Sequence, residues 1–172
     1  MKKNLISVFF LFSLFIYPSS AVAAPVPAID YQLPYPGILP DNSIYPLKVI
    51  RDKIAGFFIK NPLKKAEFNL LKADVRMSAA ISLTEQKKSV SLAMTTISNA
   101  QDYFSEALRK TGEAKAQGID IRDFVKRLVT ANQKHQEIVG EIEKKIDKKD
   151  KKKFELVKKR ILTLSHEVKK IR

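Results

Sequence analysis

Side chains suited to covalent or metal chemistry are few in this 172-residue chain. Cysteine is absent and the only histidines are His135 and His166, which excludes disulfides, thiol nucleophiles and thiolate zinc sites. Asn132 and Thr163 stand three residues before these histidines, so the Glu-x-x-His pairs of di-iron bundles are missing. A His-Glu-x-x-His zinc motif, a nucleophile elbow and a glycine-rich phosphate loop are missing too. We therefore predict a protein that is not an enzyme and uses no cofactor or metal.

His135 falls on the apolar stripe of a predicted helix, and two interpretations are open. It can act as a pH-sensitive switch or a ligand, or it can be a core-edge histidine that hydrogen-bonds to a neighbouring helix. We favour the second, because no other histidine or cysteine lies close to it in the sequence.

A run of lysines is the strongest chemical signal in the sequence. Residues 144–172 carry 13 basic and four acidic side chains, and the run contains Lys144, Lys145, Lys148, Lys149, Lys151, Lys152 and Lys153. We predict that residues 144–153 form a cationic turn that binds phosphate-rich polymers or lipid headgroups. The alternative is a solvated turn with no partner. Phe154 is the only aromatic residue beside the run, which disfavours single-stranded nucleic acid because stacking platforms are missing.

Residues 1–23 have the pattern of a secretory signal peptide. Lys2 and Lys3 precede an apolar stretch over residues 5–16, and small residues at 21–23 suit cleavage after Ala23. The alternative is an uncleaved anchor, but this stretch is short for a membrane span of about 20 residues. Removing Lys2 and Lys3 leaves 30 basic and 18 acidic residues, a net charge of +12. We expect a secreted or extracytoplasmic protein that meets a membrane only peripherally or through an uncleaved signal.

Proline and apolar periodicity divide the rest of the chain into an arm and a helical domain. Seven prolines lie between residues 24 and 62 and none follows, so residues 24–42 are predicted to be a Pro-rich extended arm whose latter part lies along the helices. Residues 43–172 are predicted to be all-α, an antiparallel bundle of about four long helices plus a short N-terminal helix.

The short helix is predicted to be capped by Ser43, with Pro46 in its first turn. Apolar side chains follow at spacings of three and four and give it one apolar face: Leu47, Ile50, Ile54, Phe57 and Phe58. Asn61 and Pro62 end this helix and begin the next.

The long helices have their own boundary signals. A polar stretch at residues 85–89 predicts a turn, and either Gly112 or Gly118 can end the third segment. Asp120 is the predicted cap of the fourth segment, with Asp123 completing a weak capping box.

The last helix has the most regular pattern. Its apolar residues follow heptad steps of three and four: Phe154, Val157, Ile161, Leu164, Val168 and Ile171. Ile146 and Phe154 are eight residues apart, so the apolar stripe shifts around the helix axis across the lysine run. Two arrangements are open: a hairpin at the lysine run or one continuous helix. We favour the hairpin, because a continuous helix would expose this apolar seam.

Residues 39–48 resemble the opening motif of an uncharacterised domain family of secreted bacterial proteins. The family phrase Leu-Pro-Asp-Ser/Asn-x-x-Tyr-x-x-Lys is matched by Leu39, Pro40, Asp41, Tyr45 and Lys48. The departure is Ser43-Ile44-Tyr45 in place of the usual Ser-Pro-x-Tyr, which can shift the start of the helix by a residue. The resemblance implies export and a helical architecture, but no activity.

Two later elements carry the same resemblance. Glu67 lies in a Lys-Ala-Glu segment, and Asp74 and Arg76 form an acidic-x-Arg element. The resemblance covers about residues 33–108, with the motifs at 39–108, and leaves out the lysine-rich half. We interpret the motif residues as structural, with Lys48 paired to Asp52 along the helix or Asp52 paired to Arg76 across helices.

Together these patterns predict an exported, non-enzymatic helical module, an interaction or structural protein of the bacterial envelope. Its predicted partners are an envelope protein, an anionic wall polymer or lipid headgroups, rather than nucleic acid. The alternative is a purely protein-binding or self-associating bundle that uses the seam over residues 154–171.

Overall fold

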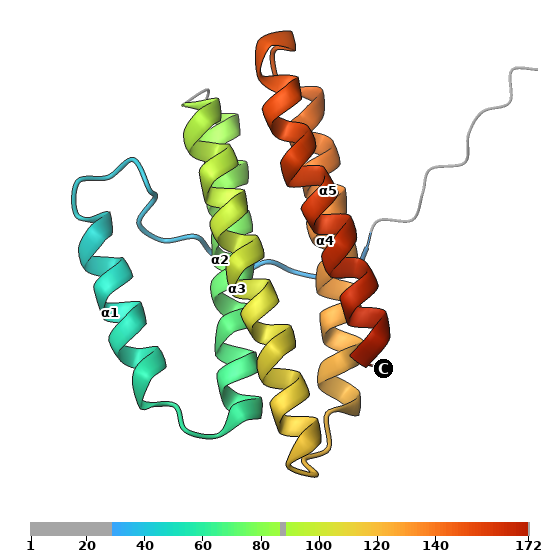
Figure 1. Ribbon diagram of the computed structural model, residues 1–172. Coiled ribbons are helices and arrows are strands. Elements are labelled where there is room, and N and C mark those ends of the chain that lie inside the picture. Colours follow the sequence, from blue (N-terminus) through green and yellow to red (C-terminus); the bar gives the residue numbers. More distant parts are fainter. Residues whose placement is uncertain (1–28, 87–88, 172) are drawn as a thin grey trace, which may run out of the picture.

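Helices make up most of the chain in a computed structural model that describes residues 29–86 and 89–171 (Figure 1). They are α1 (Tyr45–Phe58), α2 (Pro62–Glu85), α3 (Val90–Ala116), α4 (Arg122–Lys144) and α5 (Lys148–Ile171). The described residues include no strand, so the all-α prediction is confirmed. The predicted signal peptide and residues 24–28 of the arm lie outside the described residues.

The four long helices form an antiparallel bundle in which consecutive helices run in opposite directions (Figure 1). α2 packs on α3 and α4 packs on α5, and contacts of α3 with α5 and of α2 with α4 join the two pairs. The chain therefore reverses at the lysine run, as predicted. In the part of the chain described, no helix is long and apolar enough to span a bilayer.

The core has two large apolar layers with polar side chains between them, and a small third cluster made of Ala114, Ile121 and Val125. The layer near the α4–α5 turn includes Met77, Ile97, Ile142, Phe154 and Ile161. The layer near the other end includes Leu70, Phe104, Leu128, Leu164 and Val168. The heptad seam of α5 thus contributes to both layers and packs within the chain. The buried polar residues between the layers include Asp74, Gln101 and His135.

The arm crosses the bundle rather than running parallel to its helices (Figure 1). Tyr31 packs against the layer that contains Phe104, and Leu33 against the layer that contains Phe154. The arm therefore packs on the bundle, as expected, but it crosses the helices instead of lying along them.

Helix ends follow the predicted signals in part. Asn61 caps α2 by accepting the Lys64 N–H at 3.0 Å, with Pro62 in the first turn. The prediction for Ser43 is wrong: α1 begins after Ile44, and the Asn42 side chain accepts the Ile44 N–H instead. The third helix passes through Gly112 and ends before Gly118, whose φ of 74° supplies the left-handed residue.

The start of α4 differs from the predicted capping box. The N-cap is Ile121 and not Asp120 as predicted, although the Asp120 side chain accepts the Arg122 N–H at 3.0 Å and so satisfies a free donor at this end. Asp123, however, pairs with Lys126 at 2.9 Å instead of returning to the cap.

α1 packs on α2 through its polar side. Asp52 is 3% exposed and pairs with Lys72 of α2 at 3.0 Å and with Arg51 at 2.9 Å. A Cβ on Gly56 would stand 3.0 Å from the Phe68 ring, so glycine leaves room for this α2 side chain against α1. Asp52 and Gly56 are the residues of α1 that are buried. The apolar face that the sequence predicts is turned toward solvent, away from the bundle.

Replacing Asp52 with Ala is expected to release α1 while the bundle stays folded. Burial alone raises the pKa of Asp52, but hydrogen bonds from Arg51 and Lys72 outweigh it and lower the pKa overall. The ion pair therefore stabilises docking above the ordinary carboxyl pKa of about 4 and is lost as pH falls through the lowered value. Amide exchange in α1 should accelerate about tenfold or more in the variant, because a buried cation loses its partner. Unchanged exchange would show that the pair does not hold α1.

Candidate functional site

The lysine turn, residues 144–153, lies at one tip of the bundle where α4 ends and α5 begins (Figure 1). The turn is fixed by Ile146, which is buried in the core, and by Phe154, which is 1% exposed. All seven predicted lysines are exposed around these two anchors. The apolar stripes therefore hold the backbone while the cationic side chains point to solvent.

The positive charge of the lysine turn is largely uncompensated. Among the residues described, only Lys149 of the seven lysines has a carboxylate within ion-pair distance, Asp147 at 4.0 Å. The nearest glutamates, Glu143 and Glu155, both accept from Lys158, at 2.9 and 3.3 Å. These two glutamates thus neutralise a neighbouring cation rather than the turn, and the seven lysines outnumber the two aspartates within it, so the tip presents a concentrated positive field.

Five of these lysines also stand in the first turns of α5. Positive charge at a helix N-terminus opposes the helix dipole, so they slightly disfavour the helix that carries them. An anion bound at this tip gains from both the lysines and the free N–H groups of the helix start. The arrangement suits a phosphate or carboxylate ligand with several charges.

A buried polar cluster joins the arm, α2 and α4 at mid-height of the bundle. Asp74 accepts the Tyr31 hydroxyl at 2.6 Å, and its other oxygen lies 2.8 Å from His135 Nε2. A carboxylate can only accept hydrogen bonds, so this contact is a hydrogen bond when His135 Nε2 carries the ring hydrogen. Burial and the neighbouring Asp74 raise the pKa of Tyr31 above its usual range, which keeps the hydroxyl a donor. His135 is thus the helix-to-helix histidine that we favoured.

Replacing Tyr31 with Phe is expected to destabilise the fold by about 1–3 kcal/mol, because Asp74 then loses one donor in a buried site. Urea denaturation monitored by circular dichroism measures the change. Tyr35, which is 86% exposed in the same arm, supplies the matched control, and Tyr35→Phe should leave stability unchanged. Equal stabilities of the two variants would mean that the arm does not dock through Asp74.

The family-motif residues make structural contacts. Lys48 donates to the carbonyls of Pro36 at 2.6 Å and Ile38 at 3.0 Å, and its Nζ lies 5.6 Å from the Tyr45 ring centroid. Burial lowers the pKa of Lys48 and raises that of Tyr45. These contacts tie the arm to α1. The predicted Lys48–Asp52 pair is therefore wrong, because arm carbonyls take the ammonium group.

The predicted pair between Arg76 and Asp52 is also wrong. Lys72 stands one turn earlier on α2 and reaches Asp52 first, and the Arg76 guanidinium lies over the Tyr103 ring at 4.1 Å. Glu67 pairs with Lys64 at 2.9 Å on the same helix. Leu39 and Pro40 are half-buried and Asp41 is exposed in the turn before α1.

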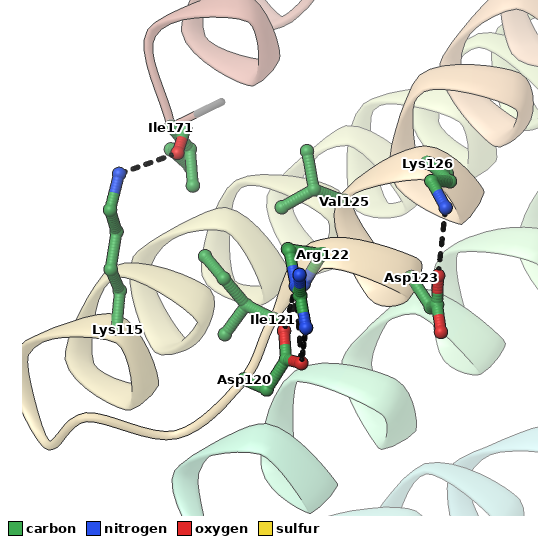
Figure 2. Close-up of a pocket in the computed structure, with 8 residues that line it drawn as sticks. All are labelled: Lys115, Asp120, Ile121, Arg122, Asp123, Val125, Lys126 and Ile171. Atoms are coloured by element: carbon green, nitrogen blue, oxygen red, sulfur yellow. Dashed lines mark hydrogen bonds and ion pairs between the residues drawn. The ribbon is translucent and has the colours of Figure 1, made fainter.

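A pocket of about 470 Å³ lies at the end of the bundle opposite the lysine turn (Figure 2). Its charged side chains already have partners: Arg122 pairs with Asp120 at 2.7 Å and Lys126 with Asp123 at 2.9 Å, while Lys115 donates to the Ile171 carbonyl at 2.9 Å. The hydrogen bonds from Arg122 hold the pKa of Asp120 at about 2. The described residues that line the pocket thus offer no unpaired charge for chemistry. Within residues 29–86 and 89–171, no group of three or more possible metal ligands gathers.

With this geometry established, comparison with known families identifies the chain. A family model described as a domain of unknown function (DUF5667) matches residues 37–149. The chain therefore belongs to this family. No curated protein and no solved structure matches it. The match extends past the predicted limit at residue 108 to include α4 and most of the lysine turn, so the prediction that the C-terminal half lies outside the family is wrong in part.

Two features were missed by sequence reasoning. The first is the hydrogen bond from Tyr31 to Asp74, because nothing local in the sequence identifies these two residues as partners. The orientation of α1 was missed too, although a signal existed: Asp52 and Gly56, which suit a close polar contact, share the side opposite the apolar face.

Proposed function

We propose that this protein is an exported, non-enzymatic helical module of the bacterial envelope whose lysine turn binds an anionic polymer or lipid headgroups. The observation that carries the proposal is the exposure of seven lysines at one tip, with a carboxylate near only one of them among the described residues. The predicted signal peptide supports the location, and His135, buried against Asp74, stands out of reach of a substrate.

Each basic residue near an anionic membrane contributes about 1 kcal/mol to binding. Seven clustered lysines therefore suffice for measurable binding without a shaped pocket, provided the partner carries several negative charges. A wall polymer or a headgroup surface has this property, whereas a single small anion does not.

Co-sedimentation tests the proposal. The chain without residues 1–23 should bind anionic wall polymer or vesicles containing anionic lipid at about 0.1 M salt, and binding to the polymer should fall steeply at about 1 M, where the screening length is about 3 Å. Binding to neither partner at low salt would contradict the proposal.

A further inference from the structure

The outward face of α1 is the largest apolar feature that the described structure leaves exposed. Phe57 and Phe58 are each 70% exposed, and more than half of the Leu47 and Ile54 side chains is exposed as well. Ile50 completes the face. A contiguous cluster of large apolar side chains on a protein surface indicates an interaction site, whereas single exposed apolar residues are common and need no explanation.

The polar anchoring of α1 keeps this face outward. Asp52 and Gly56 fix the opposite side of the helix to α2, and Lys65 donates to the Gly56 carbonyl. Rotating the apolar face toward the bundle would break the Asp52–Lys72 pair and leave Lys72, whose side chain is only 12% exposed, without that partner. The exposed face is thus imposed by specific contacts on the other side.

Cations border the apolar face on both sides. Arg51 lies along one border and Lys53 along the other, and Lys60 follows just after the end of the helix. Lys60 Nζ stands 5.3 Å from the Phe57 ring centroid. The single acidic residue of α1 is Asp52, which is buried and paired, so the outward surface carries positive charge only.

From this arrangement we infer that α1 is an interfacial helix that lies in the surface of a bilayer containing anionic lipid. Helices of this type insert Phe, Leu and Ile side chains at the boundary between headgroups and acyl chains, while Lys and Arg at the borders contact the headgroups. A second copy is the poorer occupant, because facing helices would bring Arg51, Lys53 and Lys60 of two chains together. Charge complementarity therefore selects the anionic bilayer.

The bilayer contact rests on the proposed envelope location, but its surface is separate from the lysine turn. α1 flanks α2 on the side away from α5, whereas the lysine turn is at the tip of the α4–α5 hairpin (Figure 1). Each surface can therefore be tested while the other is intact.

The absence of tryptophan from the chain permits a direct test. Phe57→Trp places a single indole on the proposed face, and Leu162→Trp places one on α5 farther from the lysine turn, where Leu162 is 53% exposed. With vesicles of phosphatidylglycerol and phosphatidylcholine, the emission of the first variant should shift to the blue and be quenched by brominated lipid. The second variant should show neither change.

A second comparison separates the two surfaces. Replacing Ile50, Ile54 and Phe57 with Gln should reduce vesicle binding at about 1 M salt by about tenfold or more, because apolar insertion persists when charges are screened. The melting temperature should be unchanged, since the replaced side chains are exposed. Binding of this variant to wall polymer should equal that of the unaltered chain.

Three outcomes would overturn the inference. If the indole emission of the Phe57→Trp variant stays unshifted on bound vesicles, the lysine turn is the membrane contact and α1 is not. If the emission of this variant shifts equally with vesicles of phosphatidylcholine alone, the helix does not require anionic lipid. Concentration-dependent dimers without lipid, abolished by Ile54→Gln, would assign the face to a second copy instead.

Discussion

Replacing Ile161 with Asp is expected to lower the free energy of unfolding by more than about 3 kcal/mol, because an unpaired carboxylate would be buried in the core. Ile161 is 3% exposed and belongs to the apolar layer that also contains Met77, Ile97 and Phe154. These neighbours come from α2, α3 and α5 and are all apolar. None of them can therefore pair with a carboxylate. A loss of this size is a large share of the stability of a small domain.

Leu162→Asp supplies the matched control for that variant. Leu162 is the next residue on the same helix and is 53% exposed, so the same chemical change there should cost less than about 1 kcal/mol. Thermal unfolding followed by circular dichroism compares the two proteins. Equal melting temperatures would mean that α5 does not dock on the bundle and that the hairpin at the lysine turn is wrong.

Patterns within one helix predicted the fold well. The heptad steps from Phe154 to Ile171 place five side chains on the buried side of α5, and the Asn61-Pro62 signal marks the start of α2. Such signals depend on neighbours three or four residues away, which the sequence displays directly. The hairpin was predictable for the same reason, because the two stripes on either side of the lysine run need one common core.

Contacts between distant segments were not predictable. Tyr31 and Asp74 are 43 residues apart, and Asp74 and His135 are 61 apart. The error at Asp52 has a similar origin: several cations lie within reach of its carboxylate, and the packing of α1 on α2 decides in favour of Lys72. Side-chain partners of this kind depend on helix rotation and spacing, which one sequence does not specify.

The apolar face of α1 shows the limit of periodicity. The spacing of Leu47, Ile50 and Ile54 predicts a helix with one apolar side, and the helix is present. Periodicity ordinarily implies that this side is buried. Here a buried ion pair at Asp52 and the close contact at Gly56 fix the opposite side to the bundle instead.

The lysine turn was the best predicted part of the candidate site. Its lysines are adjacent in sequence, so their proximity required no knowledge of the fold, and the buried anchors Ile146 and Phe154 were visible as the ends of two apolar stripes. What the sequence could not specify was that Glu143 and Glu155 bind Lys158 and leave the turn uncompensated.

Charge removal at the lysine turn should produce the largest functional effect. The variant replaces five exposed lysines with Gln: Lys148, Lys149, Lys151, Lys152 and Lys153. At about 1 kcal/mol for each basic residue near an anionic surface, binding at low salt should weaken by about a hundredfold or more even when only three of them engage the ligand. The fold should be retained, because the side chains replaced lie outside the core.

A second variant controls for net charge. It replaces five exposed lysines near the opposite end of the bundle with Gln: Lys64, Lys115, Lys126, Lys169 and Lys170. Both variants lose the same charge, so any difference between them reports where the anion binds rather than how positive the protein is.

Co-sedimentation with anionic wall polymer, at about 0.1 M and about 1 M salt, is the most direct test of the proposed function. We expect the unaltered chain and the opposite-end variant to bind at low salt and to lose most of that binding at high salt, while the lysine-turn variant binds weakly at both. Equal binding by the two variants would contradict the proposed function, because the lysine turn would then be a solvated turn with no anionic partner of its own.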